Sequence, residues 1–120
     1  MRYAIALVAM LMAGPAFGQM ITGRQLAEWC AAGGQSPLLA GCLGYIRGVH
    51  DSGAYLFRLL QKPQMICVPH YTPPEKLISA VRYYLAVHQD AADLDAGSSV
   101  TYALMATFSC DPAALREFLK

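Results

Sequence analysis

A long amphipathic stretch, residues 36–60, is the feature that most restricts what this chain can fold into. Small or apolar side chains recur along it at alternating steps of three and four residues: Leu39, Cys42, Ile46, Val49, Gly53, Leu56 and Leu60. This spacing predicts one helix that packs against other helices, with Arg47, Asp51 and Arg58 on its other side. Ser36 and Pro37 suit the N-cap and the first helical position. No stretch of the chain alternates with period two, so we expect an all-α fold, a small bundle of four to five helices.

The first 18 residues have the pattern of a secretory signal peptide. Arg2 precedes an apolar run over residues 4–13, and residues 16–18 (Ala-Phe-Gly) place small side chains at −3 and −1 of a cleavage site. The apolar run is too short to anchor the chain in a membrane. We therefore expect residues 1–18 to be removed and residues 19–120 to form a single exported domain with no membrane contact.

All four cysteines follow this segment, at Cys30, Cys42, Cys67 and Cys110. An even number in an exported chain predicts two disulfides, for which three pairings are possible. We favour Cys30–Cys42, near the facing ends of two consecutive helices, and Cys67–Cys110, which brackets the later helices. A zinc site is the competing interpretation, and it is disfavoured because the spacings contain no CxxC pair.

Charge and motif content argue against several function classes. Apart from Arg2, eight basic side chains stand against eight acidic ones, without a run of Lys or Arg, so we expect no nucleic-acid partner. The apolar, weakly charged composition suits contact with another protein. The chain has no HExxH, GxSxG or phosphate-loop motif, and His50 and Asp51, adjacent on a helix, point about 100° apart. We expect no enzyme activity and no cofactor.

Local signals divide the rest of the chain. Thr22 and Gln25 form a capping box that opens a first helix, and Thr72 and Glu75 form a second box before a helix that ends near His88. Residues 89–97 are predicted to be a loop. Ser98 or Ser99 is the expected cap of the next helix, and Asp111-Pro112 begins a last short helical turn.

Glycines within the long stretch need an explanation, because each destabilises a helix interior relative to Ala. Gly44 and Gly48 are one helical turn apart. We expect them to let a neighbouring helix approach closely inside the bundle. The alternative is a kink near Ser52-Gly53.

The motif Cys42-Leu-Gly-Tyr45-Ile-Arg-Gly48-Val-His-Asp51 resembles the C-x-G-Y-x-x-G-x-x-D stretch of the Rap/Tai immunity proteins. The family's C-x-P, V-x-x-Y-L and A-L…P-C features follow in order as residues 67–69, 81–85 and 103–110. Two positions depart from the pattern. Ser109 stands where proline is usual, and Gln89 stands where a proline often opens an acidic loop.

The resemblance implies a small periplasmic helical protein, often a homodimer, that blocks a peptidoglycan amidase delivered by a type VI secretion system. In such pairs a protruding loop of the inhibitor plugs the active-site groove of the enzyme. The matching loop here is 89–97, so the candidate partner-binding residues are Gln89, Asp90, Asp93, Leu94 and Asp95. Gly44, Tyr45, Gly48 and Asp51 carry the motif and are the candidate structural residues.

Three alternatives stay open at this point. A periplasmic acid-stress chaperone of the HdeA kind is also small, helical and disulfide-linked, and it would expose apolar surface at low pH. A periplasmic binding module without a toxin partner would share the same fold. A small enzyme is kept only because His50, Asp51 and the six tyrosines of the mature chain remain candidates for chemistry.

Overall fold

The structure, a computed structural model, describes residues 20–118 and 120; the expected signal peptide lies outside the described residues. The described part contains helices α2 (Gly23–Ala31), α3 (Pro37–Leu59), α4 (Pro74–Val87), α5 (Ala96–Phe108) and α6 (Pro112–Phe118), with a 3₁₀ helix η1 (Gln89–Asp93) between α4 and α5. It contains no strand, and the predicted all-α class is confirmed. None of these helices has both the length and the apolar character needed to cross a membrane.

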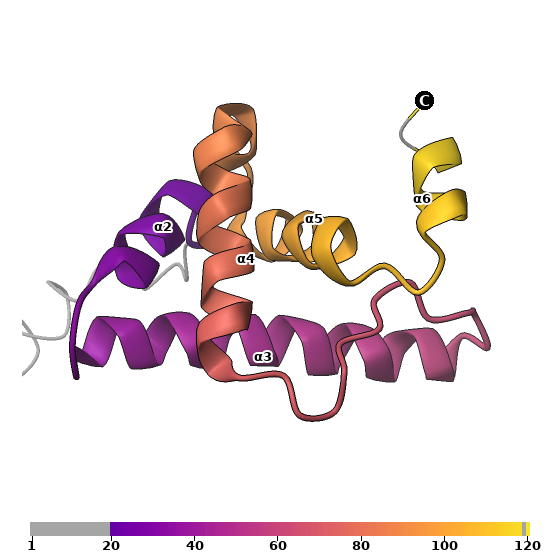
Figure 1. The fold of residues 1–120 in the computed structure, drawn as a ribbon, viewed down its shortest axis with the longest axis horizontal. Coiled ribbons are helices and arrows are strands. Elements are labelled where there is room, and N and C mark those ends of the chain that lie inside the picture. The colour runs from indigo at the N-terminus through magenta and orange to yellow at the C-terminus, as the bar shows by residue number, and fades with distance from the viewer. Residues whose placement is uncertain (1–19, 119) are drawn as a thin grey trace, which may run out of the picture.

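The helices are arranged around α3, which runs as a rod along one side of the molecule (Figure 1). Helix α4 crosses the rod steeply, α2 lies on one side of α4, and α5 lies on the other. The core forms where these four helices meet. Its fully buried side chains include Leu26, Ile46, Val81, Val100 and Leu104, one or two from each helix. Burial of such side chains is the main favourable term in folding.

Helix starts were predicted with mixed success. Thr22 and Gln25 form the expected capping box, and Ser36 Oγ accepts a hydrogen bond from the Leu38 amide. The second capping box is wrong. Helix α4 begins at Pro74 with Pro73 as its N-cap, because the Thr72 hydroxyl turns back to donate a hydrogen bond to the Pro69 carbonyl at 2.7 Å.

Both predicted disulfides are confirmed. Cys30–Cys42 joins α2 to α3, and Cys67–Cys110 joins the connector before α4 to the segment after α5. Two backbone hydrogen bonds flank the second disulfide, from the Cys67 amide to the Phe108 carbonyl (2.7 Å) and from the Cys110 amide to the Met65 carbonyl (3.1 Å). In the chain-entropy model the disulfides stabilise the fold by roughly 3 and 4 kcal/mol.

The apolar face of the long rod is left largely uncovered near its C-terminal end, which corrects the expected continuous seam. Cys42 and Ile46 are buried, but Leu56 and Leu60 expose 52% and 57% of their surface. The reason is visible in Figure 1, where α3 continues past α4 and α5 toward the connector. The last turns of α3 therefore present apolar side chains that the other helices of residues 20–118 leave largely uncovered.

The expected role of Gly44 and Gly48 is also wrong. A Cβ built at either position meets no atom of the chain within 4 Å, because both glycines lie on the exposed side of α3. The alternative, a kink near Ser52-Gly53, is not seen either, since α3 runs through these residues as one α-helix and is drawn as a straight rod in Figure 1. The packing of this chain therefore gives no reason for the glycines.

Candidate functional site

The segment predicted to be a protruding loop is held firmly against the bundle. Residues 89–93 form η1, whose Ala91 and Ala92 are buried. The Ser99 hydroxyl donates a 2.6 Å hydrogen bond to the Ala91 carbonyl. Two backbone bonds then tie the segment to the start of α2, from the Gly23 amide to the Leu94 carbonyl (2.9 Å) and from the Ala96 amide to the Ile21 carbonyl (2.8 Å). The corner between α4 and α5 is consequently an ordered part of the fold.

Two of the five candidate partner-binding residues have partners within the chain. Asp93 lies 2.8 Å from Arg24 Nη2, in an ion pair whose side chains are 75% and 65% exposed. Asp95 is the N-cap of α5, which corrects the expected Ser98 or Ser99 cap. Its carboxylate accepts hydrogen bonds from the Ser98 hydroxyl (2.7 Å) and amide (2.9 Å), and these bonds lower the pKa of Asp95. Asp95 therefore contributes to the stability of the corner whether or not it contacts a partner.

The other three candidates, Gln89, Asp90 and Leu94, are exposed at the surface. Leu94 exposes 43% of its surface, which is high for a leucine between two short helices. Nothing in the fold requires these three side chains to point outward together. Their contact with a partner stays a prediction.

Aromatic side chains lie beside the corner on the α5 side. The rings of Tyr84 and His88 stack with centroids 4.3 Å apart. Partial burial raises the pKa of Tyr84, and the negative charge of Asp90 and the neighbouring Tyr102 raise it further. Tyr84 on α4 therefore lies within electrostatic reach of Asp90 on η1 and Tyr102 on α5.

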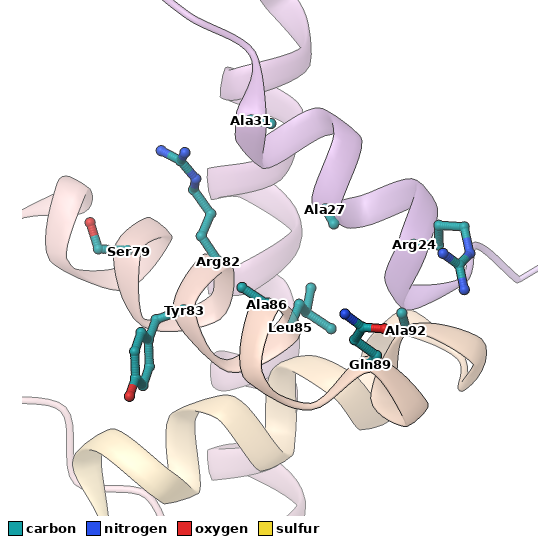
Figure 2. A pocket seen from close by; sticks show the side chains of 10 residues that line it. All are labelled: Arg24, Ala27, Ala31, Ser79, Arg82, Tyr83, Leu85, Ala86, Gln89 and Ala92. Atoms are coloured by element: carbon teal, nitrogen blue, oxygen red, sulfur yellow. The ribbon is translucent and has the colours of Figure 1, made fainter.

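A groove lies on the opposite side of the corner, between α2 and α4 (Figure 2). Its volume is about 670 Å³. Short or apolar side chains make up part of the lining: Ala27, Ala31, Leu85, Ala86 and Ala92. Longer polar side chains complete it: Arg24, Ser79, Arg82, Tyr83 and Gln89. Gln89 links this groove to the candidate partner-binding residues.

The motif residues on α3 lie elsewhere, on a shallow groove between α3 and α5. Gly44, Tyr45 and Gly48 line it together with Asp95. Burial and the nearby Asp95 carboxylate raise the pKa of Tyr45. Tyr45 thus lies between the motif helix and the cap of α5, which is consistent with a structural role.

The prediction that the side chains of His50 and Asp51 point apart is wrong. His50 Nδ1 lies 3.2 Å from Asp51 Oδ1, although neighbouring helix positions were expected to diverge. The side chains reach each other at the exposed surface of α3, where Asp51 is 79% exposed. The part of the chain that the structure describes holds no group of three or more His, Cys, Asp or Glu side chains arranged to bind a metal.

Sequence reasoning missed several residues that build the corner. Ser99 is fully buried, and it lies on the same helical face as Ala96 and Ala103, a spacing that could have marked it as inward-facing. Arg24 and Arg82 come from two helices that are distant in sequence. Single-sequence periodicity has no signal that both line the same groove.

The fold and these surfaces define a small, disulfide-linked helical protein with an ordered corner and two grooves. Residues 22–110 match the family model for Rap1a immunity proteins, so the chain belongs to this family. No curated protein matches the chain, and no solved structure does. Immunity proteins act against secreted effectors, which makes a protein effector the expected class of partner, and they are in general not catalysts.

Proposed function

We propose that this protein is a periplasmic immunity protein that binds and inhibits a peptidoglycan amidase delivered by a type VI secretion system, without catalysing a reaction itself. The observation that carries the proposal is the family match over residues 22–110. The two disulfides support action in an oxidising compartment such as the periplasm. The pattern of residues 1–18 supports export to that compartment.

The corner at η1 is the surface proposed to meet the amidase. Gln89, Asp90 and Leu94 are exposed there on a backbone fixed by the Ser99 hydrogen bond and the two bonds to the start of α2. A rigid corner loses little conformational entropy on binding, which favours tight inhibition. Tyr83 and Val87, 72% and 55% exposed on the last turns of α4, supply adjacent apolar contacts.

A homodimer through the second half of α3 is part of the proposal. Tyr55, Leu56, Leu59 and Leu60 form what we name the α3 end strip, and they expose 61%, 52%, 63% and 57% of their surfaces. Tyr55 and Leu59 continue the helical face that carries Gly48. In an antiparallel pair of α3 helices, these large side chains of one copy would lie over the glycines of the other. A two-fold interface requires this kind of self-complementary surface.

A protection assay tests the proposed function. An amidase effector is directed to the periplasm of a test bacterium, with or without this protein, and cell lysis is followed by optical density. We expect co-expression of the full chain to prevent lysis. A chain starting at residue 19, which lacks the expected signal peptide and stays in the cytoplasm, should not protect. Lysis in the presence of the exported, disulfide-bonded chain, for every type VI amidase tested, would refute the proposal.

The α3 end strip also favours a second candidate, a chaperone of the HdeA kind that binds unfolded clients through exposed apolar surface. This function predicts that aggregation of acid-sensitive proteins is suppressed near pH 2–3. Light scattering of a client with and without the chain separates the two candidates.

A further inference from the structure

The groove between α2 and α4 has a lining suited to a peptide segment. Ala27 and Ala31 of α2 face Ala86 of α4 across it, and Leu85 and Ala92 lie deeper, with 5% and 8% of their surfaces exposed. Figure 2 shows the alanine methyl groups between the two helices, with Ser79 toward one end and Gln89 toward the other. Short side chains leave space for a guest backbone to approach both helices, and the volume of about 670 Å³ is in the range of ligand-binding clefts.

The charged side chains that line this groove are all positive. Arg24 lies at its η1 end and Arg82 projects from α4, and no Asp or Glu is among the lining residues. Glu28 lies one turn after Arg24 on α2 but does not line the groove. In a chain whose formal net charge is only +1, two guanidinium groups beside one apolar groove are a local concentration of positive charge.

Arg24 already forms an ion pair with Asp93, and the strength of this pair decides whether Arg24 can also bind a guest. The Asp93 carboxylate lies 2.8 Å from Arg24 Nη2, with both side chains mostly exposed to solvent. Ion pairs of this kind contribute little to stability. A guanidinium has five N–H donors and can hold a second carboxylate without releasing the first. The Arg24–Asp93 pair therefore positions Arg24 beside the groove and leaves donors for a guest.

We propose that this groove binds an acidic segment of the effector, with carboxylates on Arg24 and Arg82 and a small apolar side chain against the alanines. Tyr83, 72% exposed, is placed at the edge to contact the same segment. Arg and Tyr are the side chains most often found at the energetic centres of protein interfaces. The inference rests on the proposed function only for the identity of the partner; the preference of the groove for acidic segments stands on its lining.

Peptide titration of the full chain, with both disulfides formed, tests the groove without an effector. The probes are two eight-residue peptides, one alternating Asp with Ala and the other alternating Asn with Ala. Binding is followed by the NMR signals of the Ala27, Ala31 and Ala86 methyl groups. We expect the acidic peptide to shift these signals and to bind at least tenfold more tightly than the neutral peptide. Equal binding of the two peptides, no binding, or shifts confined to other surfaces would overturn the inference.

Matched variants make the test specific. Arg82→Gln should weaken binding of the acidic peptide roughly tenfold, the effect of losing a charge-assisted hydrogen bond. Arg58→Gln removes an exposed arginine from the far end of α3 and should leave binding unchanged. If Arg58→Gln weakens binding as much as Arg82→Gln does, the attraction is non-specific and the inference fails. An effector that binds the chain with unchanged affinity after Arg82→Gln would also overturn it, while leaving the proposed immunity function intact.

Discussion

The hydroxyl of Ser99 donates a 2.6 Å hydrogen bond to the backbone carbonyl of Ala91, and both residues are buried. This bond joins α5 to the middle of η1. The same carbonyl accepts a 3.3 Å hydrogen bond from the Leu94 amide, so the Ser99 hydroxyl adds a link from α5 to a carbonyl that η1 already uses. The exposed residues Gln89, Asp90 and Leu94 lie on the segment that this bond and the two backbone bonds to the start of α2 hold in place.

Ser99→Ala should destabilise the protein by about 1 kcal/mol, because it removes the shorter of two hydrogen bonds to the Ala91 carbonyl and leaves the 3.3 Å bond from the Leu94 amide. Ser79→Ala is the matched control, since Ser79 is exposed on α4 and its replacement should change stability by less than about 0.5 kcal/mol. Denaturant unfolding measures both values. Amide exchange over residues 89–95 should also accelerate in Ser99→Ala. Unchanged exchange there would show that the bond does not hold the corner.

Gly23→Ala adds only one methyl group but should clearly destabilise the folded protein. A Cβ at Gly23 would lie 2.6 Å from Ser99 Oγ and 2.7 Å from the Ala91 carbonyl oxygen, so the corner must move to admit it. We expect a loss of about 2 kcal/mol in the free energy of unfolding.

Gly53→Ala is the control for that substitution. A Cβ at Gly53 meets no atom within 4 Å, and alanine favours the helix. This variant should gain about 0.5–1 kcal/mol in unfolding free energy. Thermal or denaturant unfolding compares the two variants. Equal effects of the two substitutions would contradict the packing described at Gly23.

The stability of the corner should depend on pH through Asp95. The hydroxyl and amide of Ser98 lower the pKa of the Asp95 carboxyl below its ordinary value of 3.8. A folded-state pKa below the unfolded one stabilises the protein above the ordinary pKa, and that contribution disappears as the pH falls through the folded value. Asp95→Asn keeps a capping side chain but removes the charge.

Urea unfolding of the wild-type chain and of Asp95→Asn is measured at pH 7 and pH 2.5. We expect the wild-type chain to have the larger free energy of unfolding at pH 7, and the difference between the two chains to shrink toward zero at pH 2.5. A difference that stays the same at both pH values would show that the ionised carboxylate does not stabilise the cap.

The proposed dimer makes a direct prediction about mass in solution. Leu59→Glu places a charge in the α3 end strip and should convert the dimer to a monomer with an unchanged helical circular-dichroism spectrum. Leu38→Glu is the control, because Leu38 is 50% exposed at the opposite end of α3. Light scattering coupled to size exclusion gives the masses. A wild-type chain that is monomeric at all concentrations would exclude the interface.

The features that were predictable from sequence depend on local chemistry. Thr22 with Gln25 and Ser36 with Pro37 mark helix starts within four residues, and the structure has both helices where expected. The disulfide pairing followed from the antiparallel layout of the first two helices. Local hydrogen bonding and chain connectivity leave few alternatives in these cases.

The predictions failed where several nearby residues can form the same helix cap, or where distant helices decide which side chains are covered. Ser98 or Ser99 was the predicted cap of α5, and only the fold shows that Asp95 takes the cap while Ser99 bonds to η1. Periodicity along α3 identified an apolar face but not what covers it. Leu56 and Leu60 follow the same spacing as Cys42 and Ile46, yet they remain exposed because the last turns of α3 extend past α4 and α5.

The central claim, that the corner at η1 blocks an amidase, is tested most directly by titrating type VI peptidoglycan amidases with the purified chain and measuring residual peptidoglycan cleavage. The account predicts complete inhibition at one chain per enzyme for the cognate amidase. It also predicts that Leu94→Glu weakens inhibition at least tenfold, while Leu38→Glu inhibits like the wild-type chain. Full activity of every amidase in the presence of excess folded chain, or equal inhibition by Leu94→Glu and the wild-type chain, would contradict it.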